Sequence, residues 1–491
     1  MLGLTAAAAV LTLRSPFLGL GVLVAGMAFH NFLIMGLIKL GSSHLLIRIV
    51  QSWKEVLIAL LLVIAALRLY RGYRQGAIAR LVVLDWIVIA FFALMVLYLV
   101  LPSGVLHGHA NFQQRIAAFR LAVYMPVLYA LGRSFQAPAP HDLAGVAWMV
   151  VGAAALVGLF GLYELWFVPT RTWLSWGIND FSAWLGFRYS GPGNLPENFF
   201  QTLPSGLYLR RMVSTYLSPL GIAYTGLLVF PIAVVLVDRQ RRGTVAAFLA
   251  SFALMFMIAG LLFSVTRLAI FALAAEGILL AVLIRRPWVT IMAPLLVVAV
   301  FAVLAIYPQV GPAVDSNLVA GGPNRGGIIR AGDPSFIEHL KTVEADAKVA
   351  ARHPLGEGLG SAGSSANRFT SGTSSNPDYA PGESAVLTMF VDTGLVGGAA
   401  YLAMYLLGLV QAARALLKAK PGTWESVLPL SALVGGLALV PITLTSDVWG
   451  DLSVLFLFWW GVGYSAGQAR DAVPVISALR SQYHRLKPAA T

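Results

Sequence analysis

Four polar residues stand out in a chain of long apolar runs, because their side chains suit the transfer of a phosphate-linked group. Arg210 and Arg211 are adjacent in LYLRRMVSTYLSP, and Arg267 lies in LLFSVTRLAIF. A guanidinium can bind the oxygens of a phosphate or pyrophosphate with two parallel N–H donors. Glu383 ends a long polar stretch just before an apolar run, and an ionised glutamate can accept a proton from a hydroxyl group. These residues predict a pyrophosphate site beside a general base.

Each of these residues also has a structural interpretation. An arginine at the end of an apolar run can extend to lipid headgroups, as Arg210 would do. A carboxylate at the start of a helix is stabilised by the helix dipole, as Glu383 would be. The sequence leaves these alternatives open. We assign Glu383 as the base, Arg211 and Arg267 as the cations that act on a departing pyrophosphate, and Arg210 as a further substrate ligand.

The polar stretch before Glu383 contains a second group of candidates. Pro334 can start a helix, and apolar side chains recur at helical spacing from Phe336 onward. This pattern predicts an amphipathic helix over 335–352, which Pro354 ends. The glycine-rich turn that follows does not match a nucleotide-binding loop, because no strand precedes it and no Lys-Ser/Thr pair follows it; we interpret it as a tight turn that allows close backbone approach. The residues predicted to bind substrate here are His353, Gly356, Gly358, Arg325 and Arg330.

The composition identifies the class of protein that carries these residues. Hydrophobic residues make up 58% of the 491 residues and charged residues only 11%, whereas a soluble globular protein carries about 25% charged residues. Repeated apolar runs long enough to cross a bilayer predict an all-α, polytopic transmembrane protein, with residues 1–491 as one membrane domain. We predict about 12 spans, at 17–40, 55–69, 81–101, 116–134, 143–167, 216–237, 244–263, 268–284, 288–307, 385–410, 424–444 and 452–468.

Basic residues cluster at one end of the predicted spans. They follow the second, sixth, eighth, tenth and last spans, in groups that include Arg71 and Arg74, Arg239 and Arg241, Arg285 and Arg286, Arg414 and Lys418, and the tail 469–491. If the spans alternate in direction, every group falls on the same side, which the positive-inside rule assigns to the cytoplasm. Both termini are therefore predicted to be cytoplasmic. The formal net charge of +13 is then a topology signal, and we predict no nucleic-acid partner.

Two long segments fall on the opposite, external side. Residues 168–215 are rich in tryptophan, phenylalanine and tyrosine, which indicates either anchoring at the membrane interface or a platform on which sugars stack. Residues 308–384 form a long loop with eight acidic and six basic residues, so the loop does not share the positive bias of the chain. Loops of this length are usually functional. Both segments are predicted to contribute to the site.

The sequence offers little for metal or redox chemistry. It contains no cysteine, which excludes disulfides and cysteine-bound metals. No group of acidic residues and histidines has convincing ligand spacing. We expect neither a metal nor a cofactor.

Four motifs occur in an order that resembles the bacterial O-antigen ligase and polymerase superfamily. They are RMVSTYLSP, SVTR, HPLGEGLG and ESAVLTMFVDTGLVGG, and the resemblance covers roughly residues 55–465. It implies a metal-independent, inverting glycosyltransferase in the inner membrane that acts on undecaprenyl-pyrophosphate-linked glycans at the periplasmic face. Arg211 and Arg267 would hold the pyrophosphate leaving group. The implied partners are the lipid bilayer, the lipid-linked donor, a glycan acceptor, and a flippase or chain-length regulator.

One departure from the ligase pattern favours a particular reaction. Where the ligases carry His-Asn, this chain has Glu383 and Ser384, which looks more like exopolysaccharide polymerases. We therefore predict polymerisation of lipid-linked repeats into exopolysaccharide or O-antigen, with helix 335–352 closing over the acceptor. The alternatives are a ligase that transfers a finished glycan to lipid A-core and, with less support, a transporter. A transporter has less support because this sequence lacks the internal repeat that transporters usually contain.

Overall fold

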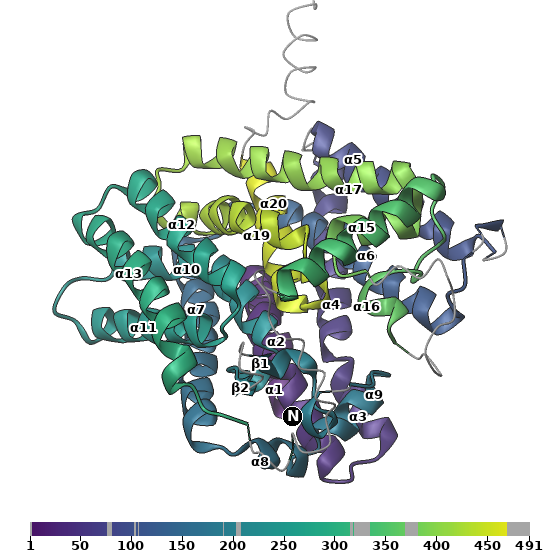
Figure 1. The fold of residues 1–491 in the computed structure, drawn as a ribbon. Coiled ribbons are helices and arrows are strands. Elements are labelled where there is room, and N and C mark those ends of the chain that lie inside the picture. Colours follow the sequence, from purple (N-terminus) through teal and green to yellow (C-terminus); the bar gives the residue numbers. More distant parts are fainter. Residues whose placement is uncertain are drawn as a thin grey trace, which may run out of the picture.

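The computed structural model describes residues 2–75, 81–102, 105–106, 108–189, 191–202, 208–314, 318, 334–368 and 382–468. The described chain is helical over most of its length, with long helices packed side by side (Figure 1). Helices suit apolar runs in a membrane because they satisfy every backbone polar group within one segment. The prediction of an all-α polytopic protein is confirmed.

The elements follow the apolar runs closely. The first half of the chain contains α1 (Leu2–Arg14), α2 (Pro16–Lys39), α3 (His44–Gln51), α4 (Trp53–Arg74), α5 (Val83–Val100), α6 (Phe112–Ser134), α7 (Pro140–Phe167), α8 (Thr170–Ser175), α9 (Ile178–Trp184), β1 (Phe200–Thr202), β2 (Tyr208–Arg210) and α10 (Pro219–Arg239). The second half contains α11 (Val245–Phe263), α12 (Arg267–Ile284), α13 (Pro287–Val310), α15 (Pro334–Arg352), α16 (Gly363–Ala366), α17 (Ala385–Lys418), α18 (Val427–Leu430), α19 (Gly436–Thr443) and α20 (Leu452–Gln468).

Each predicted span coincides with a helix. Within the described ranges, 11 helical segments are long and apolar enough to cross a membrane. The twelfth predicted span is α20, which has 17 residues. The helix predicted at 335–352 is α15. The prediction contained no strand, and the short pair β1–β2, with Phe200 opposite Arg210, is a small addition to the helical fold.

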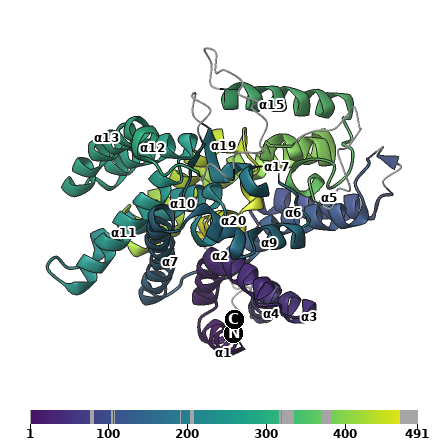
Figure 2. The same ribbon diagram turned by 60° about the horizontal axis from the view of Figure 1, so that its bottom comes forward.

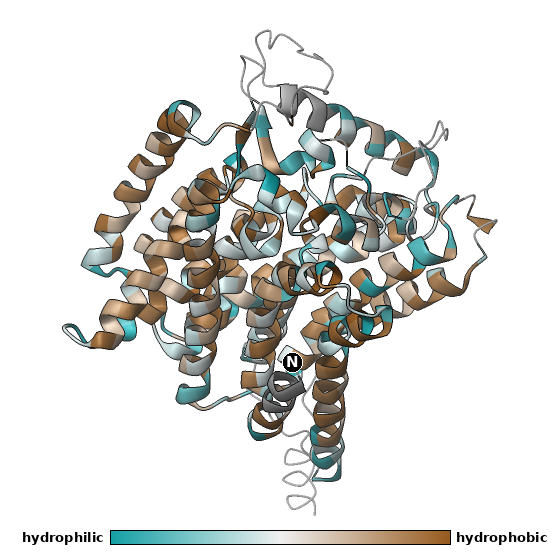
Figure 3. Ribbon diagram, turned by 90° about the horizontal axis from the view of Figure 1, so that it is seen from below, coloured by the Kyte–Doolittle hydropathy of each residue, from teal (hydrophilic) through white to brown (hydrophobic). Residues whose placement is uncertain are grey.

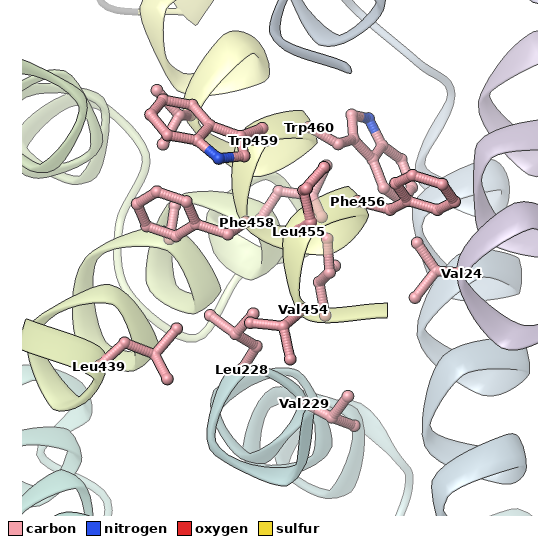
Figure 4. Packing of buried hydrophobic residues seen from close by; sticks show 14 of the residues in the cluster. Val24, Leu228, Val229, Leu439, Val454, Leu455, Phe456, Phe458, Trp459 and Trp460 are labelled. Carbon is pink, nitrogen blue, oxygen red and sulfur yellow. The ribbon is translucent and has the colours of Figure 1, made fainter. Parts of the chain in front are cut away.

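Helix α20 forms the centre of the molecule. It packs against α2, α6, α10 and α17, and Figure 4 shows its side chains close to Val24 of α2 and to Leu228 and Val229 of α10. Trp459 and Trp460 are fully buried, and the ring of Trp460 lies 5.1 Å from the ring of Phe17 in an edge-on arrangement. Helix α20 is therefore surrounded by protein, whereas peripheral helices such as α13 expose apolar side chains. Figure 3 shows these peripheral helices hydrophobic along most of their length.

Helix α17 is interrupted near its beginning, and this break positions the loop elements. Gly394 has φ 66° and ψ −166°, which no helical residue adopts. The backbone of Pro354 reaches the break, where its carbonyl accepts a hydrogen bond from Leu395 N at 2.9 Å. Helix α15 packs alongside the first part of α17 through Val349, Ala350 and Val391 (Figures 1 and 2).

Candidate active site

Polar residues from several helices meet at one end of the bundle. Helices α10, α12, α17 and α20 begin there, and α11 and α19 end there. Two contacts of Ser446 join these termini: its carbonyl accepts from Ala385 N at 3.1 Å, and its hydroxyl accepts from the Tyr224 hydroxyl at 3.0 Å. The predicted base and the predicted cations belong to segments that converge at this end.

The opposite end of the bundle contains basic residues that the sequence grouped together. Arg286 Nε lies 3.2 Å from a carboxylate oxygen of Asp238, and the Trp288 indole donates to the same carboxylate at 3.1 Å. Arg239 lies 6.0 Å from the ring centre of Trp424. The helix ends around Asp238 therefore carry clustered positive charge, as the orientation prediction requires.

Arg211 is held against the turn that starts α12. Its Nε donates to Ser264 O at 2.8 Å, and its Nη2 donates to Thr266 Oγ1 at 2.7 Å. Thr266 directly precedes Arg267, whose charge acts on Arg211. Burial lowers the pKa of the Arg211 guanidinium to about 10, and Arg267 contributes in the same direction. Arg211 remains charged at neutral pH, and Arg267 lies within electrostatic range of it.

Arg210 takes a different position from its neighbour. Adjacent residues of a strand point to opposite faces, and the side chain of Arg210 enters the protein, where the residue is only 6% exposed. Its guanidinium forms an ion pair with Glu164 on α7 and donates to Val168 O. The Trp173 indole donates to the same Glu164 oxygen at 2.9 Å. This arrangement supports a structural role for Arg210 in place of the predicted role as a substrate ligand.

Glu383 lies just before the first turn of α17 and is partly buried. The cap of the helix is Ser384, whose hydroxyl accepts from Leu387 N at 3.1 Å. The charges of Glu383 and Arg211 both act on the Tyr224 hydroxyl. Tyr224 is therefore within electrostatic range of both the predicted base and Arg211, a proximity that the sequence did not indicate.

Asp346 on α15 is a further acidic residue that the sequence analysis missed. It is fully buried, and its Oδ1 accepts a hydrogen bond from Gly382 N at 3.1 Å. Its Oδ2 is buried with no hydrogen-bond partner among the described residues. Burial raises the pKa of Asp346 to about 6, and the charge of Glu383 adds to this shift. Helix α15 is thereby fastened to the residue that precedes Glu383.

The glycine-rich turn is bound to the break in α17. Gly358 N donates to Asp392 O at 3.0 Å, and the Asp392 carboxylate accepts from the backbone N–H groups of residues 360–362, each at 3.0 Å. Gly356 has φ 75°, and a Cβ on it would lie 2.4 Å from Gly394 N. The turn does bring two backbones close together, as interpreted from the sequence. These contacts support a scaffolding role for Gly356 and Gly358, whose predicted binding role stays a prediction.

Three predicted substrate ligands remain: His353, Arg325 and Arg330. His353 Nε2 is 3.5 Å from an oxygen of Glu357, a residue of the same turn. Arg325 and Arg330 lie outside the described residues. In the part of the chain that the structure describes, no three His, Cys, Asp or Glu side chains form a group that could hold a metal.

Two more carboxylates reach the site from the segment between α19 and α20. Asp447 accepts a hydrogen bond from Ser364 N at 3.2 Å, and Asp451 acts on Tyr224 together with Glu383. Burial raises the pKa of Asp447, and it raises the pKa of Asp451 to about 7, with Asp447 adding to that shift. The sequence did contain a signal: two acids four residues apart, in SDVWGD, between two apolar spans on the external side.

The aromatic segment 168–215 has both buried and accessible parts. Trp173 is 1% exposed and packs edge-on against Trp176 at 5.1 Å, so it is neither a membrane anchor nor a sugar platform. Phe187 and Tyr189 are less buried and stack at 5.8 Å. Arg368 lies 4.7 Å from the ring centre of Phe187. This pair is the part of the segment that could contact a saccharide.

Comparison with known proteins finds a family to which part of this chain is similar. The comparison with curated proteins finds no match. A family model described as O-antigen ligase matches residues 252–402. The matched range includes Arg267, α15 and Glu383, while Arg211 and Asp451 lie outside it. Residues 252–402 are therefore similar to the O-antigen ligase family, in agreement with the superfamily of O-antigen ligases and polymerases that the sequence resembles.

Proposed function

We propose that this membrane protein is a glycosyltransferase that polymerises undecaprenyl-pyrophosphate-linked oligosaccharide repeats at the periplasmic face of the inner membrane. The similarity of residues 252–402 to the O-antigen ligase family supports glycosyl transfer of the ligase or polymerase type. The observation that carries the proposal is the hydrogen bonding of Arg211 to the turn that starts α12, directly before Arg267. Two adjacent guanidiniums form a clamp suited to the two phosphates of a lipid-linked donor.

In the proposed reaction, the anomeric carbon of the donor changes partners. A hydroxyl oxygen of the acceptor sugar attacks this carbon, and Glu383 takes the hydroxyl proton. The bond between the anomeric carbon and the pyrophosphate oxygen breaks, and the electron pair leaves with the pyrophosphate. Arg211 and Arg267 stabilise the negative charge that develops there. Attack from the face opposite the leaving group inverts the anomeric centre and requires no metal.

The loop helix α15 would control access to the base. The hydrogen bond between Asp346 and Gly382 connects this helix to the backbone next to Glu383. A movement of α15 would therefore displace the residue that accepts the proton. We infer that α15 closes over the acceptor.

The orientation in the membrane follows from the charges. We infer that the clustered basic residues at the opposite helix ends are cytoplasmic, as are both termini.

The distinction between polymerase and ligase depends on the acceptor. Glutamate at position 383, where the ligases carry histidine, favours the polymerase. The test is an incubation of the purified full chain with lipid-linked repeat units and no other acceptor. A ladder of longer lipid-linked products is expected. Transfer only after addition of lipid A-core would establish a ligase, and movement of the lipid-linked glycan across a vesicle without bond formation would establish a transporter.

A further inference from the structure

Arg368 is held in place at the end of α16, with its side chain incompletely satisfied. The side-chain amide of Gln114 on α6 donates to Ala366 O at 2.7 Å and to Arg368 O at 2.9 Å, which fixes the backbone. The guanidinium lies over Phe187, and its Nε is buried with no hydrogen-bond partner among the described residues. A buried donor without a partner is costly, which indicates that a ligand supplies the acceptor.

A second arginine, Arg120, lies near Arg368 on the apolar helix α6. The charge of Arg120 acts on Arg368, and its own side chain is 43% exposed. Its Nη1 is 3.8 Å from Glu55, but the same Glu55 oxygen already accepts a hydrogen bond from the Tyr124 hydroxyl at 3.0 Å. An exposed cation within a span of a membrane protein is unfavourable unless water or an anion reaches it. Glu55 compensates Arg120 only in part, so this pair of arginines has capacity for a further anion.

Asp447 and Asp451 link this pair electrostatically to the residues around Arg211. The charge of Asp447 acts on Arg368, and Asp447 in turn acts on Asp451. Asp451 and Arg211 both act on Tyr224. The interactions thus run from one arginine pair, through the carboxylates, to the other pair.

Helix α16 connects the second arginine pair to the base. A Cβ on Gly382 would lie 1.8 Å from Gly363 N, so the backbone that precedes Glu383 lies against the start of α16. Arg368 follows this short helix by two residues. A ligand bound at Arg368 would therefore lie close to Glu383, where the acceptor hydroxyl is proposed to react.

We propose that Arg120 and Arg368 form a second anion site, which holds the pyrophosphate of the second lipid-linked glycan, the acceptor. This inference rests on the proposed function, because a polymerase joins two molecules that each carry a lipid pyrophosphate. The stacked pair Phe187 and Tyr189 offers an aromatic face to the saccharide that links this pyrophosphate to the reacting hydroxyl. Exposure of Arg120 on a membrane span gives a lipid-linked phosphate a lateral route to the site.

The first experiment measures binding, so that its result does not depend on catalysis. Undecaprenyl pyrophosphate is titrated into the purified full chain in nanodiscs of zwitterionic lipid. The expected stoichiometry is two per chain for the wild type and one for the Arg120→Gln/Arg368→Gln double variant. The matched control is Arg241→Gln, an exposed arginine in the turn after α10, which is expected to bind two. A stoichiometry of one for the wild type, or of two for the double variant, would overturn the proposal.

A phospholipid headgroup presents the same phosphate chemistry, and the assay separates the two sources. Nanodiscs that contain phosphatidylglycerol are expected to leave the stoichiometry at two. If phosphatidylglycerol displaces one equivalent, the site belongs to a phospholipid and the proposal fails.

Kinetic measurements assign the second site to the acceptor. Arg368→Gln is expected to raise the KM for the lipid-linked acceptor at least tenfold. The KM for the same saccharide on a neutral alkyl chain, and the KM for the donor, are expected to stay unchanged. An equal effect on both acceptors would overturn the proposal. Absence of transfer by the wild type with every acceptor would instead refute the proposed function, and the binding stoichiometry would still decide whether the second site exists.

Discussion

Neighbouring residues of the same type can serve different purposes in this protein. Arg210 is the last residue of strand β2 and Arg211 directly follows it, and their side chains take different directions. The first is buried against Glu164, and the second bonds to the turn before Arg267. Removing Arg210 would leave Glu164 without its cation inside the protein, so this change should reduce stability. Removing Arg211 should affect the reaction.

The clamp predicts a strong dependence on the shape of the cations. Arg211→Lys and Arg267→Lys each keep the positive charge but lose the two parallel donors. We expect about a 100-fold lower rate of chain extension in either variant, which corresponds to about 2.7 kcal/mol in transition-state stabilisation. The measurement is product chain length and rate with purified protein. Arg285→Lys, at the opposite end of α12, is the control and should keep the wild-type rate; near-normal chain length in Arg267→Lys would contradict the clamp.

The role of Glu383 as the base can be tested with an isosteric change. Glu383→Gln removes the carboxylate that accepts the proton, so turnover should fall at least about 100-fold. Expression and lipid-linked donor binding should stay normal. The control is Glu344→Gln, which removes an exposed carboxylate paired with Lys348 on α15 and should have little effect. Wild-type turnover in Glu383→Gln would remove this residue from the mechanism.

At the scale of elements, the glycine-rich turn and the break in α17 form one unit. The carboxylate of Asp392 accepts hydrogen bonds from three successive backbone N–H groups of the turn. The residues before the turn bond to the break itself, where Leu395 N donates to Pro354 O. The break at Gly394 therefore exchanges helical hydrogen bonds for contacts with the loop. This unit determines the position of the first turns of α17, and Glu383 lies just before them.

The close approach of these backbones can be tested by adding a single methyl group. Gly356 and Gly243 both have positive φ, 75° and 76°, so alanine is strained to a similar degree at either position. A Cβ at Gly356 would lie 2.4 Å from Gly394 N, whereas a Cβ at Gly243 has no atom within 4 Å. Gly356→Ala should lower the unfolding free energy by about 2 kcal/mol more than Gly243→Ala. Equal losses in thermal unfolding would show that packing against α17 contributes nothing.

The stability of the folded protein is expected to depend on pH through Asp346 on α15. Its pKa of about 6 in the folded protein exceeds the ordinary value of 3.8, because burial disfavours the charged carboxylate. The folded state then holds the proton to higher pH than the unfolded chain, so Asp346 makes stability fall as pH rises from about 4 to about 6.

The matching variant is Asp346→Asn, which cannot ionise but keeps an oxygen that can accept from Gly382 N. Its melting temperature should fall less than that of the wild type between pH 4 and pH 6, and it should be at least as high at pH 7.5. Thermal unfolding followed by tryptophan fluorescence measures both values. If the melting temperatures of the two proteins change with pH in the same way, the Asp346 proton does not contribute to the pH dependence of stability.

At the scale of the whole molecule, the two ends of the bundle differ in chemistry. One end contains Arg211, Arg267, the buried carboxylates and α15, and the other contains clustered basic residues near Asp238 and Trp424. This polarity is what a membrane enzyme needs if its substrate arrives on one side only. It also makes the orientation in the membrane a testable property.

The absence of cysteine from the sequence makes the orientation test direct. Single cysteines at Lys348 on α15 and at Arg242 after α10 place one thiol at each end, and both positions are exposed. A membrane-impermeant maleimide should label Lys348→Cys in intact spheroplasts and Arg242→Cys only after lysis. The cysteine-free wild type is the control. Labelling in the reverse order would place the active site in the cytoplasm.

The spans and the loop helix could be predicted from the sequence alone, and the sequence also singled out Arg211 and Arg267 as candidates. These features depend on local composition: apolar runs of membrane length, helical periodicity from Phe336, and arginines where the positive-inside rule does not expect them. The match of α15 to the predicted helix and of each span to a helix follows from this local character.

The set of polar residues that meet in one region could be found only from the folded protein. Asp346, Tyr224 and Asp451 come from separate helices and loops, and their approach to Glu383 or to each other depends on helix packing that no local pattern encodes. The same packing separated Arg210 from Arg211, because the face of a short strand is fixed by its partners and by Glu164. Hydrophobicity is a property of each residue and can be summed along the chain. The pairing of buried charges is a property of distances between elements, and those distances exist only in the folded protein.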